Sequence, residues 1–76
     1  MKLSKQLDLY KKQDKVVLKH FSKNETTPFK VAEFSAVSGV PLVVIYYILQ
    51  KELDIDFKCD IIRLSEFYNL DIDIEL

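Results

Sequence analysis

The stretch from Val31 to Gln50, VAEFSAVSGVPLVVIYYILQ, constrains the fold more than any other part of the chain. Apolar side chains recur in its first half at intervals of three residues, at Val31, Phe34, Val37 and Val40. This spacing predicts a short helix buried on one side. Gly39 can adopt the positive φ with which a helix commonly ends. Pro41 suits the start of a second helix, because the N–H that proline lacks would be unpaired there. The stretch therefore predicts two helices joined by a tight turn, which is the spacing of a helix-turn-helix.

Residues 43–48, VVIYYI, favour a β-strand by intrinsic propensity, because β-branched and aromatic residues are enriched in strands. The apolar positions nevertheless follow a helical period, with Val44, Ile45, Ile48 and Leu49 on one side. Together with the Gly-Val-Pro turn that precedes it, this pattern predicts a helix. We therefore expect a helix-turn-helix over about residues 30–51.

The remaining segments also carry helical patterns. Residues 3–22 place apolar side chains at intervals of three, four and seven, with lysines on the other faces, and this predicts a first helix. Residues 57–68 predict a further amphipathic helix, and residues 71–76 a short final one. Apolar and acidic residues alternate at 53–57 and 70–76, which leaves short extended segments open as the alternative there.

The length and composition of the chain suit one folded domain. Its 76 residues are too few for two hydrophobic cores. Apolar residues make up 49% of the chain, which argues against intrinsic disorder. We expect a single all-α domain over residues 1–76, a small bundle of four to five helices that contains the helix-turn-helix.

The net charge of −1 conceals a strong asymmetry along the chain. Residues 1–30 hold eight lysines against three acids, giving +5, and residues 31–76 hold three basic residues against nine acids, giving −6. The lysines of the first helix are most simply a solvated face; the alternative is contact with nucleic acid or an acidic partner. The acidic half contains the second helix of the helix-turn-helix, where it would repel phosphate.

The outward face of that second helix is apolar and aromatic. Its residues are Leu42, Val43, Tyr46, Tyr47 and Gln50. Base edges and phosphates are contacted mainly by Gln, Asn, Ser, Arg and Lys, so this face suits contact with another protein better than DNA. Glu52, Asp54 and Asp56 follow directly and would form an acidic rim. Two alternatives remain open: the face is core of its own domain, or it serves self-association.

The sequence contains no recognisable catalytic or metal-binding constellation. It has one histidine, His20, and one cysteine, Cys59, without a glycine-rich phosphate loop or clustered ligands. We therefore expect no enzyme activity, no cofactor and no metal. A single cysteine allows no intramolecular disulfide, which suits the reducing cytoplasm. The longest nearly apolar run, residues 39–49, is shorter than the about 20 residues of a membrane helix, so we expect no membrane span.

The order of these segments resembles the Cro and repressor type of helix-turn-helix domain of temperate phages. The residues that match the core and turn positions of that family are Phe34, Gly39, Val40, Ile45 and Ile48, with Ser35 in place of the usual alanine. The family's closing helix and short terminal helix correspond to IIRLSEFYNLDIDIEL. The positions that contact operator DNA in the family are here Pro41, Leu42, Val43, Tyr46, Tyr47 and Gln50, of which only Gln50 is a usual base-reading type.

This departure makes the chain similar to the modulator-of-repression antirepressors of such phages. The resemblance implies a protein of the bacterial host cytoplasm that binds the N-terminal DNA-binding domain of a phage repressor. Tyr46, Tyr47, Leu42 and Val43 would be the buried anchors, and the acidic rim would face the repressor's basic residues. Direct DNA binding would then occur only within the complex, if at all. The alternative is a Cro-like DNA-binding transcriptional regulator.

Overall fold

The computed structural model describes residues 1–76, and its regular elements are all helices. They are α1 (Leu3–Leu9), the 3-10 helix η1 (Lys11–Gln13), α2 (Asp14–Phe21), α3 (Pro28–Ser38), α4 (Leu42–Leu53) and α5 (Lys58–Phe67). The only strand-like pairing is an isolated parallel bridge between Lys2 and Asp71. The all-α class expected from the sequence is therefore confirmed. None of these helices has the length and apolar character needed to span a membrane.

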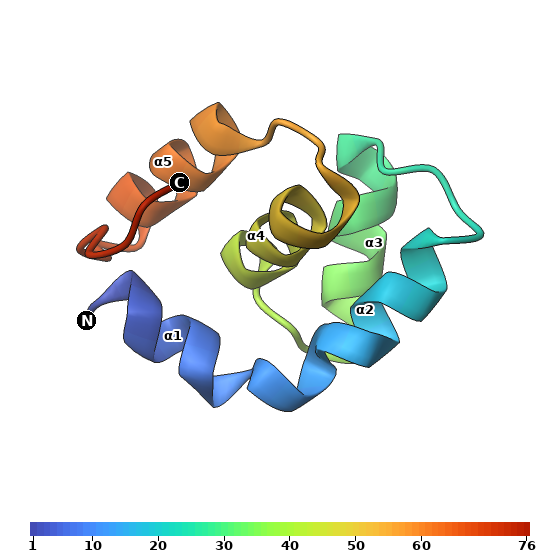
Figure 1. The fold of residues 1–76 in the computed structure, drawn as a ribbon, viewed down its shortest axis with the longest axis horizontal. Helices are drawn as coiled ribbons and strands as arrows, with labels where there is room; N and C mark the ends of the chain where they lie inside the picture. The colour runs from blue at the N-terminus through green and yellow to red at the C-terminus, as the bar shows by residue number, and fades with distance from the viewer.

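Helix α4 forms the centre of the core, and the other helices surround it (Figure 1). Six of its twelve residues are buried: Val43, Val44, Ile45, Tyr46, Ile48 and Leu49. The surrounding elements add six buried apolar side chains, which are Leu3, Val17, Phe21, Val31, Val40 and Ile61. A helix that is apolar nearly all round can be buried all round. Packing on several sides therefore overrides the β-propensity of residues 43–48, which lie in α4 as the apolar period predicted.

Local interactions define both ends of α3 and its connection to α4. The Thr27 hydroxyl caps α3 by accepting a hydrogen bond from the Lys30 N–H at 3.3 Å. Gly39 ends α3 in the left-handed region with φ 79°, as its position in the sequence predicted. Pro41 lies one residue before α4, at its N-cap. The Ser35 hydroxyl donates to the Val40 carbonyl at 2.7 Å and so joins the last turn of α3 to the connection.

The expected first helix over residues 3–22 is divided into α1, η1 and α2. The regular α-helix is interrupted at Tyr10, whose φ of −115° and ψ of 20° are not helical. A straight helix of 20 residues would be about 30 Å long, which is almost the full 31 Å length of the molecule. The interruption allows Leu3 of α1 and Val17 of α2 both to join the core.

The expected short helix over residues 71–76 is absent, and that prediction is wrong. The segment is irregular and lies beside the start of α1, as Figure 1 shows. The Asp71 N–H donates to the Met1 carbonyl at 3.0 Å, and the Leu3 N–H donates to the Asp71 carbonyl at 2.7 Å. These bonds replace those that a terminal helix would make. Residues 54–57 are likewise irregular, so 53–57 is not a strand.

Candidate protein-binding site

The outward face predicted on α4 is largely inside the domain. Val43 is 2% exposed and Tyr46 is 6% exposed, so the expectation that both are surface anchors is wrong. The Tyr46 ring packs on Phe57, which precedes α5, with 4.8 Å between ring centroids. Burial, and then the nearby Asp60 carboxylate, raise the pKa of the Tyr46 phenol, so it stays neutral. Both residues belong to the core, which was the alternative that the sequence left open.

Gln50, the one base-reading type on that face, is used inside the domain. Its amide oxygen accepts a hydrogen bond from the Phe57 N–H at 2.8 Å. Its amide nitrogen donates to the Leu76 carbonyl at 3.2 Å. Gln50 therefore joins α4 to the start of α5 and to the C-terminal segment. Both ends of its amide are engaged, which leaves the side chain poorly placed to contact a partner.

Leu42 and Tyr47, the two remaining residues of that face, are partly exposed and lie in separate grooves. The Leu42 groove has a volume of about 460 Å³. It is lined by Met1, Gln6, Ser35, Pro41, Leu42, Val43, Tyr68 and Leu70. It contains no charged side chain, although Leu42 and Val43 were expected to lie beside an acidic rim.

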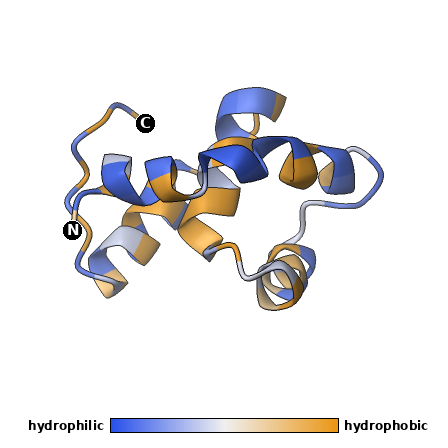
Figure 2. Ribbon diagram, turned by 90° about the horizontal axis from the view of Figure 1, so that it is seen from below, coloured by the Kyte–Doolittle hydropathy of each residue, from blue (hydrophilic) through white to orange (hydrophobic).

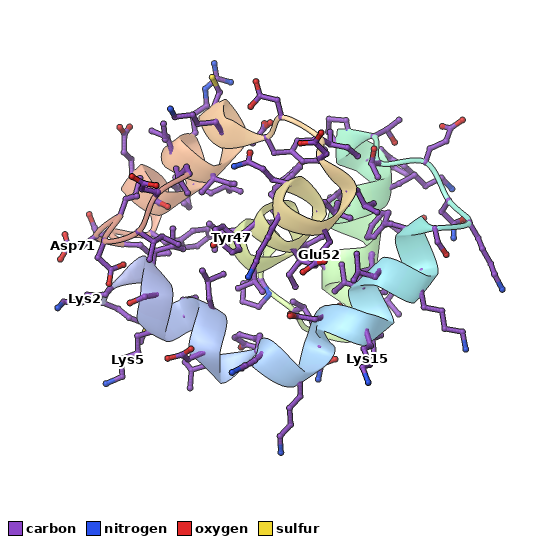
Figure 3. The ribbon with its side chains drawn as sticks, in the orientation of Figure 1. Lys2, Lys5, Lys15, Tyr47, Glu52 and Asp71 are labelled. Atoms are coloured by element: carbon purple, nitrogen blue, oxygen red, sulfur yellow. The ribbon has the colours of Figure 1, made fainter.

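The Tyr47 groove lies between the N-terminal helices and α4 and has a volume of about 260 Å³. Its apolar lining comes from Leu7, Val44, Tyr47, Ile48 and Ile74. Its polar lining comes from Ser4, Asp8, Lys11, Asp14, Lys51 and Glu52. Figure 3 shows Tyr47 and Glu52 on α4 above the N-terminal helices. The groove therefore combines an apolar interior with three carboxylates and two ammonium groups.

The acidic rim expected from the sequence is divided in the structure. Glu52 lines the Tyr47 groove, whereas Asp54 and Asp56 lie in the loop between α4 and α5 and do not. All three side chains are exposed. Asp54 ends α4 in the left-handed region with φ 54°, and the Asp56 carboxylate accepts a hydrogen bond from the Lys58 N–H at 3.1 Å. The structure thus brings Glu52 and Tyr47 together and gives Asp54 and Asp56 places at helix ends.

Two acids of the groove were missed in the sequence. Asp8 and Asp14 lie in the lysine-rich first segment, which looked like a solvated basic face. The break at Tyr10 and the turn of η1 place both acids opposite α4, beside Lys11. No pattern within residues 3–22 indicates this, because it depends on where α4 packs. The single helix expected over residues 3–22 did not predict that Asp8 and Asp14 would line the same groove.

His20 and Cys59 have no ligand set around them. No group of three His, Cys, Asp or Glu side chains could hold a metal ion. The His20 ring stacks on Phe34 with 4.4 Å between ring centroids, and Cys59 is exposed on α5. The Tyr47 groove is therefore the candidate site, and its apolar and charged lining suits the binding of another molecule.

Comparisons with protein-family models, curated proteins and solved structures find no match to the chain.

Proposed function

We propose that this protein is an antirepressor, which binds the N-terminal DNA-binding domain of a phage repressor and blocks or alters its binding to operator DNA. The observation that supports this proposal is the Tyr47 groove, in which an apolar lining is bordered by three carboxylates, from Asp8, Asp14 and Glu52, and by only two ammonium groups, from Lys11 and Lys51. The contact surface is smaller than the sequence suggested, because Val43, Tyr46 and Gln50 serve the fold instead.

The chemistry of the groove suits a basic polypeptide surface. A repressor's DNA-reading surface offers Arg, Lys and Gln to phosphates and bases. An apolar side chain of such a surface would enter the groove beside Tyr47, and its cations would meet the three carboxylates. Tyrosine is a frequent interface anchor. Charge complementarity of this kind raises the association rate and fixes orientation more than it adds affinity. Occupation of the repressor's DNA-reading surface would then exclude operator DNA by competition.

The same geometry argues against sequence reading by α4. Two of its candidate reading side chains, Val43 and Tyr46, are buried, and the amide of Gln50 is engaged by the backbone. Exposed carboxylates near the helix would repel phosphate. The Pro41–Gln50 surface therefore offers little to base edges in the major groove.

A Cro-like DNA-binding regulator remains the second candidate, and one observation favours it. Four lysines at intervals of four residues lie along η1, α2 and the residues after them: Lys11, Lys15, Lys19 and Lys23. All four are exposed and none forms an ion pair, since the only ion pair in the domain joins Lys30 and Glu33. Lys15 projects away from α4 (Figure 3). Such a row would contact phosphates without reading bases.

Calorimetry with the N-terminal DNA-binding domain of a repressor encoded in the same genome tests the proposal. We expect wild-type protein to bind, and Tyr47→Ala and Glu52→Arg each to weaken binding at least about tenfold, which corresponds to about 1.4 kcal/mol. Phe67→Ala and Glu66→Arg are matched controls, because these exposed side chains of α5 lie outside the groove. Circular dichroism checks that each variant is folded.

Two results would contradict the antirepressor proposal. One is the absence of heat from wild-type protein and repressor domain at high concentration. The other is retardation of operator DNA by the protein alone, with an affinity that falls steeply as salt rises. Loss of that retardation in Lys15→Ala and Lys19→Ala would then assign the function to the lysine row.

A further inference from the structure

Helix α1 takes its N-terminal caps from the far end of the chain. Its own N-cap residue, Lys2, makes no side-chain hydrogen bond to the helix. The Leu3 N–H donates instead to the Asp71 carbonyl at 2.7 Å, and the Ser4 N–H donates to the Asp73 carboxylate at 2.9 Å. Figure 2 shows both chain ends at the same end of the molecule. The seven residues of α1 are too few for a helix that is stable alone, so α1 depends on this attachment.

The C-terminal segment, residues 71–76, is anchored to the rest of the domain at both of its ends. Just before it, the Leu70 N–H donates to the Ser65 carbonyl of α5 at 2.7 Å. At its far end, the Leu76 carbonyl accepts a hydrogen bond from the Gln50 amide of α4 at 3.2 Å. The segment can therefore stay in place when α1 leaves it, and it offers α1 a fixed point of attachment.

Apart from this attachment, α1 is weakly held. Leu3 is its one buried residue, and α1 makes only sparse contact with the other helices. Tyr10, which follows α1, has a non-helical φ of −115° and ψ of 20°, and hinges occur at such ends of helices. A segment with few buried contacts opens at a lower free-energy cost than the whole domain unfolds. Helix α1 can therefore detach by turning about Tyr10 while the rest of the domain stays folded.

Detachment of α1 would open the Tyr47 groove. Three residues of α1 form one wall of this groove: Ser4, Leu7 and Asp8. Val44 and Ile48 of α4 also line the groove, and they are only 1% and 5% exposed. The closed groove, at about 260 Å³, is smaller than the about 300–1,000 Å³ of ordinary ligand pockets. Without the α1 wall, Val44 and Ile48 would become accessible beside Tyr47 and would enlarge the apolar surface that a partner can contact.

We propose that α1 is a lid on the Tyr47 groove, which turns about Tyr10 and is latched to the C-terminal segment by the Ser4–Asp73 contact. The Asp73 carboxylate accepts hydrogen bonds from both the hydroxyl and the N–H of Ser4. Hydrogen bonds to a charged acceptor are stronger than those between neutral groups. The closed lid restricts access to α4, and the open lid admits a partner. This inference rests on the proposed function in taking the Tyr47 groove as the binding site.

Thiol modification of the whole chain tests the lid. Val44→Cys and Val31→Cys, each in a Cys59→Ser background, place one thiol beneath α1 and one on α3, outside the Tyr47 and Leu42 grooves. The two valines are matched in burial, at 1% and 0% exposed. With dithionitrobenzoate in native buffer, we expect Val44→Cys to react at least about tenfold faster than Val31→Cys, because local opening is more frequent than unfolding. Its rate should also rise less steeply with urea, because opening of α1 exposes less surface than unfolding of the domain.

Asp73→Asn and Asp71→Asn test the latch in the Val44→Cys protein. Asp73→Asn should raise the rate of thiol modification at least about threefold, because it removes the charge of the acceptor. Asp71→Asn should leave the rate unchanged, since Asp71 is bonded to α1 through its backbone. Ile48→Cys is a second reporter of the groove should Val44→Cys misfold, and circular dichroism checks that each variant is folded.

Two results would overturn this proposal. Equal rates and equal urea dependence for Val44→Cys and Val31→Cys would mean that the groove opens only when the domain unfolds. Equal effects of Asp73→Asn and Asp71→Asn would mean that the Asp73 side chain is not the latch. Neither measurement involves a repressor domain, so a failure of the lid and a failure of the proposed function are separate results.

Discussion

Ser65 is the one buried polar side chain of the domain, and its hydroxyl has no hydrogen-bond partner. A buried hydroxyl without a partner costs free energy, and alanine is also the better helix former in the interior of α5. We therefore expect Ser65→Ala to raise the free energy of unfolding by about 0.5–1 kcal/mol. Urea denaturation followed by circular dichroism measures this change.

Ser35→Ala is the matched control for that experiment. The Ser35 hydroxyl donates to the Val40 carbonyl, so its removal leaves that partly buried carbonyl unpaired. We expect this variant to be less stable by about 1 kcal/mol. A loss of stability in Ser65→Ala similar to that of Ser35→Ala would show that the Ser65 hydroxyl has a partner in solution.

Gln50 shows why the role of a single side chain is hard to predict from sequence. Its residue type and its helical position both indicated a surface contact. In the structure its partners are the Phe57 N–H and the Leu76 carbonyl, the latter 26 residues away. No pattern around Gln50 specifies a partner at that distance. Tyr47 and Glu52, by contrast, lie in one groove as their proximity in the sequence suggested.

At the level of helices, spacing was a better guide than propensity. The period of the apolar residues predicted α4 correctly, although residues 43–48 favour a strand. Gly39 likewise predicted where α3 ends. The outcome for residues 71–76 was different, because the Asp71 backbone pairs with Met1 and Leu3 instead of starting a helix. That pairing joins the two ends of the chain and is invisible to a local pattern.

The link between α1 and the C-terminal segment makes stability depend on pH. The Ser4 hydroxyl and the Ser4 N–H, the latter at 2.9 Å, both donate to the Asp73 carboxylate. These two bonds lower the pKa of Asp73 from its ordinary value of 3.8. A lowered pKa in the folded state means that the carboxylate stabilises the fold above pH 3.8, and that this contribution is lost as pH falls through the lowered pKa.

We therefore expect wild-type protein to be more stable than Asp73→Asn at pH 7, with the difference shrinking as the pH falls below 3.8. Urea denaturation at a series of pH values measures the difference. Asp71→Asn is the control, because Asp71 contributes through its backbone and not through its side chain. A difference between wild type and Asp73→Asn that stays constant from pH 7 to pH 2 would contradict this account.

At the scale of the whole molecule, local patterns predicted the helical class and most helix positions, but not what covers α4. Val43 and Tyr46 were expected on the surface because they occupy positions that face outward on the second helix of a helix-turn-helix. They are buried once the other elements are assembled around α4. Contacts between residues about 70 positions apart, such as Ser4 with Asp73, hold the N-terminal and C-terminal segments together. Such contacts depend on the complete fold.

The C-terminal segment should therefore hold α1 in place. Removal of residues 71–76 would delete the hydrogen bonds from Leu3 and Ser4 and the bond from Gln50 to the Leu76 carbonyl. At about 1 kcal/mol for each net hydrogen bond, the bonds of Leu3 and Gln50 alone correspond to a loss of stability of about 2 kcal/mol, and the loss of the partly buried Ile74 adds to it. Hydrogen exchange should show faster exchange in α1 than in the other helices, because α1 has few other attachments.

Asp73→Asn is the matched control for the truncation, because it weakens only the Ser4 contact, by removing the charge and one acceptor oxygen, and leaves the backbone bonds of Asp71 and Leu76 in place. We expect its α1 amides to exchange at rates between those of the wild type and the truncated protein. If α1 exchanges equally slowly in all three proteins, its attachment comes from Leu3 and Leu7 in the core and not from the C-terminal segment. In that case α1 would cover α4 independently, and the Tyr47 groove would keep its shape without Ile74.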